Sequence, residues 1–324
     1  MAASGTPPAA RNGDDGMLTV LFHILTNNVI PLSAMIAAGV IMQRAFSLDI
    51  RTLSKLNFYI FSPAIMFRLL YETEISAAMF GKILLFGALF MIAQYVLADL
   101  VCRARRASPS RRAALRNSVM FYNSANYGIP LNQLVFAGNP YTLSIQVLVS
   151  MIQSLVPNTY GVYAVNAHKA KLREIGRVVL TLPVIYVIPL ALLLRAFETP
   201  IPPTLEAPIG YLANAFIGTA LLTLGVQLGS MSWRIERAMA VDVGLSALLR
   251  LVVGPALAWG LSLLMGFDRL TTAAIIVSSA VPTSLSSVLL AVEFDNEKEF
   301  ASQAVFISTL LSVFTVTIVI ALVM

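Results

Sequence analysis

Long apolar segments follow one another along almost the whole chain. Ten of them are each close to the roughly 20 residues that a helix needs to cross a bilayer. They lie at about 18–42, 53–71, 80–102, 113–137, 141–164, 177–197, 207–229, 238–266, 270–292 and 301–323. Residues 1–16 lack an apolar period and are expected to be a disordered tail. The pattern therefore predicts an all-α membrane protein with ten transmembrane helices in one domain, 17–324.

The fourth apolar segment contains a polar interruption. Residues 123–130 read Asn-Ser-Ala-Asn-Tyr-Gly-Ile-Pro in the middle of an otherwise apolar run. Proline removes a backbone donor, and no water replaces the lost bond in lipid. A plain proline kink is one interpretation. The two Asn with Gly and Pro behind them favour a broken helix whose two halves end at a protein-lined site.

A matching interruption lies in the ninth segment, where residues 278–284 read Ser-Ser-Ala-Val-Pro-Thr-Ser. Each interruption is followed by an apolar half-helix, a short loop and a further segment. Five segments precede the second half, and this odd number gives the two halves opposite orientation. We therefore expect a 5+5 inverted repeat, about 18–164 and about 177–323, with broken helices four and nine crossing at its centre.

Composition supports the membrane class. The 324 residues are 58% hydrophobic and 12% charged, with a mean hydropathy of +0.81. Cys102 is the single cysteine, so the chain can form no internal disulfide and has no cysteine cluster for a metal. We predict neither a cofactor nor a metal.

The basic residues are distributed unevenly between the loops. With the N-terminus outside, 16 of the 22 Lys and Arg fall on the inner side and four on the outer side. Cytoplasmic loops carry this excess in membrane proteins. The net charge of +6 is therefore a topology signal and not a nucleic-acid footprint. We expect a multi-pass protein of the plasma membrane with both termini outside.

Polar residues at the two interruptions are the candidate substrate ligands. Asn123 and Asn126 can each donate and accept, so each could orient a carboxylate or cap a half-helix. Small hydroxyls in membrane helices serve packing as often as binding. Cavity lining and helix–helix bonding are both open for Gln146, and Asn57 is expected to line the cavity from the scaffold side. The full candidate set is Asn57, Asn123, Ser124, Asn126, Gly128, Pro130, Asn132, Gln146, Arg250, Ser278, Ser279, Pro282, Thr283 and Ser284.

Arg250 is a charged side chain well inside the eighth segment. A charge within the membrane is costly and suggests a functional role. Snorkelling, or bonding to carbonyls of neighbouring helices, is the alternative that the sequence favours slightly.

Enzyme motifs are absent from the sequence, which has no His-Glu-x-x-His, Gly-x-Ser-x-Gly or P-loop. A secondary carrier is the favoured function. A channel or a carrier-like sensor is the alternative, and an intramembrane enzyme is a more distant one.

Three segments resemble one known family. Residues 123–131 resemble the fourth-span motif of the auxin efflux carrier family, Asn-Ser-Gly-Asn-Phe/Tyr-Gly-Leu-Pro-Leu in bacterial members, with Ala125 in place of a Gly. Residues 280–284 are similar to the ninth-span crossover, and residues 56–63 to the second-span pattern. The resemblance covers nearly all of 18–324, and the short central loop at about 166–176 matches bacterial members.

The resemblance implies a ten-span carrier related in fold to bile-acid sodium symporters. It implies a small organic anion as substrate, auxin in plant members and carboxylates such as malate or malonate in bacterial ones. Transport would proceed by alternating access, with the carboxylate at the half-helix N-termini. The sequence leaves open the coupling ion, Na⁺ or H⁺, and a homodimeric assembly in the lipid bilayer.

Overall fold

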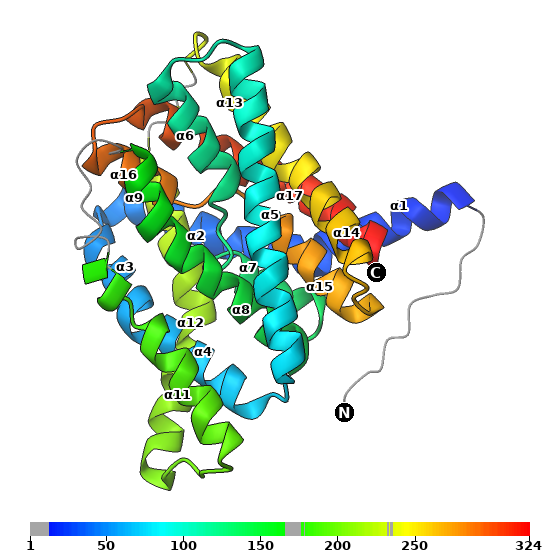
Figure 1. The fold of residues 1–324 in the computed structure, drawn as a ribbon. Helices are drawn as coiled ribbons and strands as arrows, with labels where there is room; N and C mark the ends of the chain where they lie inside the picture. The colour runs from blue at the N-terminus through cyan, green and yellow to red at the C-terminus, as the bar shows by residue number, and fades with distance from the viewer. Residues whose placement is uncertain (1–12, 166–175, 178, 232, 234–235) are drawn as a thin grey trace.

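The computed structural model describes residues 13–165, 176–177, 179–231, 233 and 236–324. Helices make up most of this described part, and it contains no named strand (Figure 1). The first-half helices are α1 (Gly13–Ile24), α2 (Ile30–Phe46), α3 (Ile50–Leu56), α4 (Ser62–Glu72), α5 (Ala77–Ala104), α6 (Pro109–Met120), α7 (Gly128–Val135), α8 (Pro140–Val156) and α9 (Val162–Val165). The second-half helices are α11 (Val184–Ala196), α12 (Pro203–Ser230), α13 (Ala240–Leu248), α14 (Gly254–Leu264), α15 (Arg269–Ser279), α16 (Ser286–Glu293) and α17 (Lys298–Val323).

Four π-helical turns join pairs of these helices into longer rods. They are η1 (Leu25–Val29), η2 (Asn57–Phe61), η3 (Pro157–Gly161) and η4 (Leu249–Val253). A proline lies just after η1, η2 and η4, at Pro31, Pro63 and Pro255, and another opens η3. Because proline leaves a carbonyl of the preceding turn without its donor, a wider turn beside it lets the helix continue.

Helices occupy all ten predicted segments. Five of them are long and apolar enough to cross a membrane, at Leu18–Phe46, Ala77–Ala104, Pro203–Ser230, Ala240–Leu264 and Lys298–Val323. In the sixth segment, the shorter apolar helix α11 begins only after Pro183. At the N-terminus, α1 begins at Gly13, inside the segment 1–16 that was expected to be disordered. Residues 1–12 lie outside the described part, as does the predicted loop except for Gly176.

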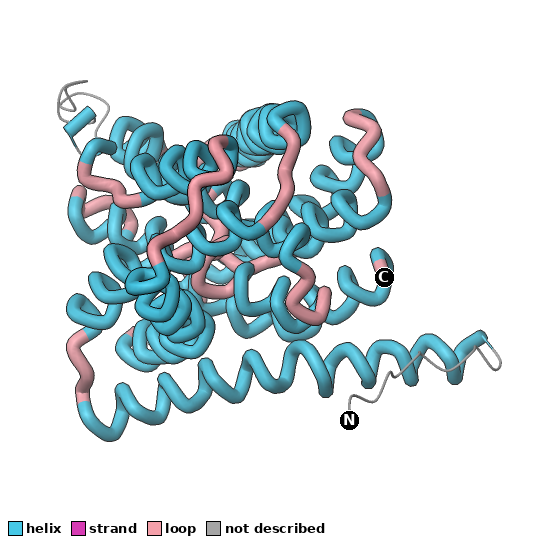
Figure 2. The backbone as a smooth tube through the Cα atoms, turned by 90° about the horizontal axis from the view of Figure 1, so that it is seen from below, coloured by secondary structure: helices cyan, strands magenta, loops and turns pink. Residues whose placement is uncertain are grey.

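One group of helices, the α2–α12 bundle, comprises α2, α3, α4, α11 and α12. The rod formed by α1, η1 and α2 runs along one edge of the molecule, and its N-terminal end projects beyond it (Figure 2). Gly39 of α2 and Gly225 of α12 let the two backbones meet, since a Cβ at either position would collide with a carbonyl of the other helix. Small residues at a membrane helix interface permit this close approach.

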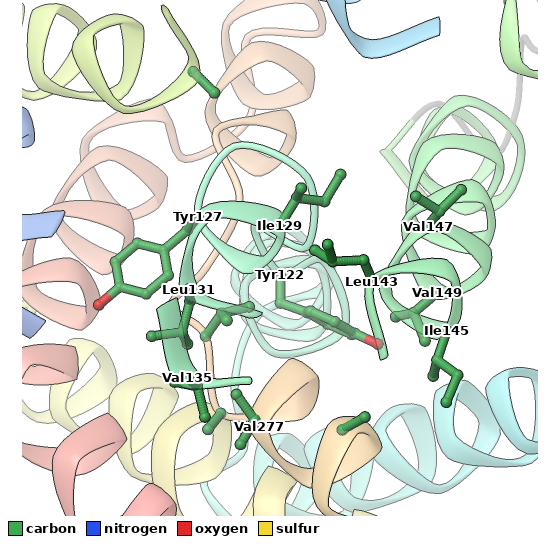
Figure 3. Packing of buried hydrophobic residues seen from close by; sticks show 14 of the residues in the cluster. Tyr122, Tyr127, Ile129, Leu131, Val135, Leu143, Ile145, Val147, Val149 and Val277 are labelled. Atoms are coloured by element: carbon green, nitrogen blue, oxygen red, sulfur yellow. The ribbon is translucent and has the colours of Figure 1, made fainter. Parts of the chain in front are cut away.

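Apart from α1 and α9, the remaining helices, α5 to α8 and α13 to α17, form a second group that we call the crossing bundle. Its core surrounds the segment between α6 and α7, where Tyr122 and Tyr127 point to opposite sides (Figure 3). Both tyrosines are almost fully buried. The Tyr127 hydroxyl accepts a hydrogen bond from Ser312 Oγ of α17 at 3.1 Å, which ties this segment to the last helix.

Candidate functional site

Two helix breaks meet in the crossing bundle. The first lies between α6 and α7, at residues 121–127, and the second between α15 and α16, at residues 280–285. Asn123 N donates to Pro282 O at 2.9 Å, and Ser284 N donates to Phe121 O at 2.8 Å. These bonds flank an antiparallel bridge between Tyr122 and Thr283. The broken backbones therefore satisfy part of each other's hydrogen-bonding capacity, which a membrane interior requires.

Pro130 does not lie in the first break. It occupies the first turn of α7, two residues after the helix begins at Gly128. A first-turn N–H has no partner within the helix, so a proline costs little there. Its ring would instead oppose extension of α7 backwards over Asn126. Pro282, by contrast, lies in the extended part of its break and supplies the carbonyl that Asn123 uses.

Side chains of the neighbouring helix α8 bond further backbone groups at the first break. Gln146 Nε2 of α8 donates to Ser124 O at 2.7 Å. A Cβ at Gly128 would lie 2.5 Å from the same Nε2, so the glycine makes room for this amide. Gln146 and Gly128 therefore support the shape of the break.

Gln153 lies two helical turns after Gln146 on α8 and bonds the backbone at the start of the first break. Its Nε2 donates to Met120 O and its Oε1 accepts from Tyr122 N, each at 3.2 Å. Gln153 is not among the candidate residues that the sequence suggested. The missed signal was a long polar side chain placed two turns from Gln146 in an apolar span.

Thr283 anchors the second break. Its Oγ1 donates to Ser118 O at 2.8 Å, and its backbone N donates to Ser308 Oγ at 3.1 Å. Ser118 Oγ in turn lies 2.7 Å from Ser246 Oγ of α13. The second break is thus held by a hydroxyl of α17 and by a carbonyl of α6, whose Ser118 is itself bonded to α13.

Arg250, on η4, is fully buried beside the two breaks. Its Nη1 donates to Val119 O at 2.9 Å, and its Nη2 donates to Ser279 O. These carbonyls belong to the last turns of α6 and α15. The guanidinium also lies over the Tyr122 ring, with Cζ 4.5 Å from the ring centre. Bonding to neighbouring carbonyls, and not snorkelling, is the arrangement that the structure shows.

A cavity of about 510 Å³ extends from the surface to the first break. Its lining includes the exposed residues Lys55 and Glu293 at one extreme and the buried Asn123 at the other. Five predicted site residues line it, namely Asn57, Asn123, Ser124, Asn126 and Ser284. Ser284 Oγ is within 3.2 Å of Ser286 N and of Ser286 Oγ, at the start of α16. The cavity thus reaches a helix N-terminus as well as the amide side chains.

Asn57 joins the cavity from the α2–α12 bundle. Its Nδ2 donates to Thr223 Oγ1 at 2.7 Å and to Thr219 O at 3.2 Å, both on α12. Its Oδ1 is buried and has no hydrogen-bond partner among the described residues. An acceptor without a partner beside a cavity is available to a bound donor or to water.

The other predicted site residues are not in the cavity lining. Asn132 exchanges bonds with Thr142 of α8, accepting from Oγ1 at 2.9 Å and donating to its carbonyl at 3.2 Å. Ser279 Oγ donates to Ile276 O, and Ser278 Oγ is buried without a partner in the described part of the chain. The complete set outside the lining is Gly128, Pro130, Asn132, Gln146, Arg250, Ser278, Ser279, Pro282 and Thr283.

The cavity has lining residues that the sequence did not single out as ligands. Lys55 and Glu293, both exposed, are two of them. Ser54 and Gln227 meet across the wall, where Gln227 Nε2 donates to Ser54 Oγ at 3.2 Å. Only the packing of α3 against α12 could bring such distant residues together.

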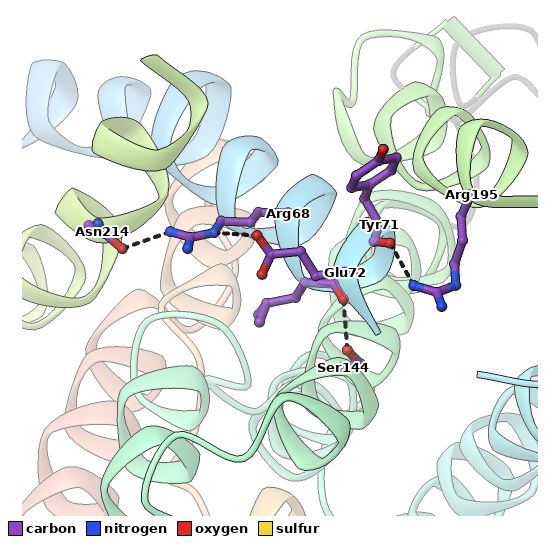
Figure 4. A network of polar contacts seen from close by, with 7 residues as sticks. Arg68, Tyr71, Glu72, Ser144, Arg195 and Asn214 are labelled. Atoms are coloured by element: carbon purple, nitrogen blue, oxygen red, sulfur yellow. Dashed lines mark hydrogen bonds and ion pairs between the residues drawn. The ribbon is translucent and has the colours of Figure 1, made fainter. Parts of the chain in front are cut away.

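The two bundles are in contact on the other side of the crossing as well. Ser144 Oγ of α8 donates to Leu69 O of α4 at 3.1 Å, and Thr73 Oγ1 donates to Pro140 O at 3.4 Å. Figure 4 shows the Ser144 bond beside an ion pair between Arg68 and Glu72, whose Nε–Oε1 distance is 2.8 Å. These residues are not in the lining of the cavity.

The described residues contain no group of three or more His, Cys, Asp or Glu placed to hold a metal ion. The polar side chains that line the cavity are amides, hydroxyls, one lysine and one glutamate, and apolar side chains lie among them. This chemistry suits non-covalent recognition of a small polar molecule.

The helical architecture and the long apolar helices define a multi-pass membrane protein. The chain belongs to the membrane transport protein family, the auxin efflux carrier-like family expected from residues 123–131, whose model matches residues 27–320.

Two relatives agree with this membership. The chain is 22% identical over 301 residues to an uncharacterized transporter of Methanothermobacter thermautotrophicus, covering 90% of this chain and 96% of the relative. It is 32% identical over 123 residues to a protein of Rhizobium meliloti named "Putative malonate transporter", covering 38% of this chain and 37% of the relative.

Proposed function

We propose that this membrane transport protein is a secondary carrier for a small organic anion with a carboxylate group. The observation that carries the proposal is the cavity that ends where two broken helices pair. Asn123, Asn126 and Ser284 line it there, and each offers a hydrogen-bond donor to a carboxylate. The name of the Rhizobium meliloti relative supports a carboxylate substrate.

The transport mechanism we propose is alternating access. Both bundles contribute to the cavity wall, and the α4–α8 hydrogen bonds connect them away from it. Movement of the crossing bundle against the α2–α12 bundle would break those bonds and expose the crossing to the opposite side. Asn123 and Asn126 would travel with the crossing bundle, while Asn57 would stay with the other.

The topology we propose is ten spans in a 5+5 inverted repeat, in the plasma membrane, with both termini outside. The position of the two breaks supports the repeat, since each follows a half-helix and precedes a short one. The ion pairs of Arg111 with Asp242 and Glu297 gather the ends of α6, α13 and α17 at one side, as the orientation requires. Na⁺ or H⁺ as coupling ion and a homodimer are parts of this proposal that remain to be chosen by experiment.

Uptake by proteoliposomes tests the function. Purified protein would be reconstituted, loaded with unlabelled malonate, malate or succinate, and exposed to the same labelled compound outside. A carrier produces counterflow, meaning transient accumulation of label against its gradient, with and without Na⁺ and pH gradients. A conductance without counterflow would identify the channel alternative, and inactivity with a broader carboxylate panel would contradict an organic-anion carrier.

A further inference from the structure

We propose that Arg250 makes the helix crossing electropositive and thereby sets the preference of the cavity for anions, without touching the bound molecule. Arg250 is therefore a positioning residue for charge and not a substrate ligand. The inference rests on the proposed function, because an anion carrier needs a positive potential where its substrate binds. It follows from which backbone groups the guanidinium bonds and from its contact with a residue that lines the cavity.

Four helix ends meet at the two breaks. The helices α6 and α15 end there with their carbonyls, while α7 and α16 begin there with their N–H groups. Each carbonyl end carries roughly half a negative elementary charge, and each N–H end roughly half a positive one. The partial charges of the four helix ends alone would therefore sum to about zero. A crossing of that kind has no net charge with which to attract an anion.

The guanidinium of Arg250 changes this sum. It bonds Val119 O at the end of α6 and Ser279 O at the end of α15, so its single positive charge offsets the two carbonyl ends. What remains is the pair of N–H ends, together worth about one positive charge. No ion pair found among the described residues includes Arg250, so no acidic side chain there cancels its charge.

The Tyr122 ring connects this charge to the cavity. The guanidinium Cζ lies 4.5 Å from the centre of the Tyr122 ring, and Tyr122 is also one of the residues that line the cavity. Lys55 and Glu293 also line the cavity, but they carry opposite signs and largely offset each other at a distance. In a low-dielectric interior, a unit charge in contact with a residue of the cavity wall retains a strong effect on a second charge.

Local structure places the side chain for this role. Arg250 lies in the π-helical turn η4, and such turns recur at functional sites. Gly254 follows one turn later, and a Cβ there would lie 2.8 Å from Arg250 Nη2. The glycine therefore leaves room for the guanidinium to fold against its own helix and reach both carbonyls.

A cysteine reporter measures the potential without any substrate. Cys102→Ala removes the natural thiol, and Ser284→Cys places a similar-sized thiol in the cavity wall beside the paired breaks. The protein in lipid nanodiscs is treated with anionic 2-sulfonatoethyl or cationic 2-trimethylammonioethyl methanethiosulfonate. The ratio of the two modification rates reports the local potential. Arg250→Gln is expected to lower the anionic-to-cationic ratio by about tenfold or more, whereas Arg250→Lys keeps most of it.

Ser62→Cys is the matched control, since Ser62 lines the same cavity from α4 in the other bundle. Its ratio is expected to be lower than that of Ser284→Cys and to respond less to Arg250→Gln. An unchanged ratio at Ser284→Cys in folded Arg250→Gln would overturn the inference. If that variant does not fold, equal ratios at the two cysteines in the otherwise unaltered protein would overturn it. Neither result depends on transport, so failure of the proposed substrate class would be recognised separately.

Discussion

Tyr122 and Thr283 face each other in an antiparallel bridge, although they are 161 positions apart in the sequence. Each is the central residue of an extended segment within a broken helix. The pairing places Asn123 and Ser284 on the same cavity wall, one from each half of the chain. A binding site assembled in this way depends on both breaks at once, and the predictions below separate its binding groups from the backbone that holds them.

Asn126→Ala is expected to weaken binding of the transported carboxylate by about 1–3 kcal/mol, the usual cost of leaving a buried polar partner unpaired. Asn126 lines the cavity, and its side chain forms no hydrogen bond with another described residue. Isothermal calorimetry or scintillation proximity binding would measure the change. Asn27→Ala is the control, since Asn27 is exposed on η1 and bonds only its own helix. Equal affinity of the parent and Asn126→Ala would remove this residue from the site.

Pro130→Ala and Pro282→Ala are expected to slow uptake more than they weaken binding. Alanine at 130 supplies a donor and lets α7 extend towards Asn126, whereas alanine at 282 loosens the extended segment that pairs with Asn123. Uptake rate and affinity would be measured on the same monodisperse preparations. Pro208→Ala, in the first turns of α12, is the comparison outside the crossing. Parent-like uptake by both crossing variants would make the breaks a packing feature.

Ser118→Ala is not a neutral control for those measurements. Ser118 is fully buried, its Oγ pairs with Ser246 Oγ, and its carbonyl accepts from Thr283. We expect the substitution to lower stability and to perturb the second break.

Ser144→Ala is expected to favour opening of the α4–α8 contact, because it removes a buried hydrogen bond between the bundles worth about 1 kcal/mol. A cysteine at Ser124, with Cys102 replaced, would then react faster with an impermeant reagent added on the outer side. Ser150→Ala is the matched control on α8, since Ser150 Oγ bonds the carbonyl of Gln146 in its own helix. Equal reactivity in both variants would show that this contact does not close the cavity.

Gly225→Ala is expected to destabilise the protein by about 1–3 kcal/mol, because a methyl group at the α2–α12 contact forces the helices apart. Gly218→Ala on the same helix is the control, since a Cβ there would be 3.9 Å from the nearest atom, Met35 Cε. Thermal unfolding monitored by tryptophan fluorescence or size exclusion would compare them. A parent-like melting temperature for Gly225→Ala would mean that the close approach is not needed.

The orientation is tested with single cysteines in a protein lacking Cys102. Ser108→Cys is expected to be shielded from an impermeant thiol reagent added outside intact cells, and Ala78→Cys is expected to be labelled. Both positions are exposed at helix ends, so labelling depends on the side of the membrane on which each position lies. Labelling of Ser108→Cys from outside would reverse the proposed topology.

Local sequence was sufficient for much of the fold. Apolar length predicted where helices lie, and the polar residues with Pro130 and Pro282 located both breaks. It was insufficient within a break, because proline and glycine mark where a helix can stop and not which backbone atoms then pair. The first break therefore begins at Phe121, upstream of the residues that announced it, since Tyr122 and Asn123 find partners in the other half of the chain.

For the same reason, only some of the predicted site residues line the cavity. The sequence by itself determined a helical membrane protein with two interrupted helices and a set of buried amides and hydroxyls, because hydropathy and backbone chemistry are local properties. Only the tertiary structure decided that Asn123 and Ser284 line a cavity while Asn132 bonds a neighbouring helix. It also decided that Arg250 reaches two carbonyl ends, since an arginine in a span finds its partners only when distant helices pack around it.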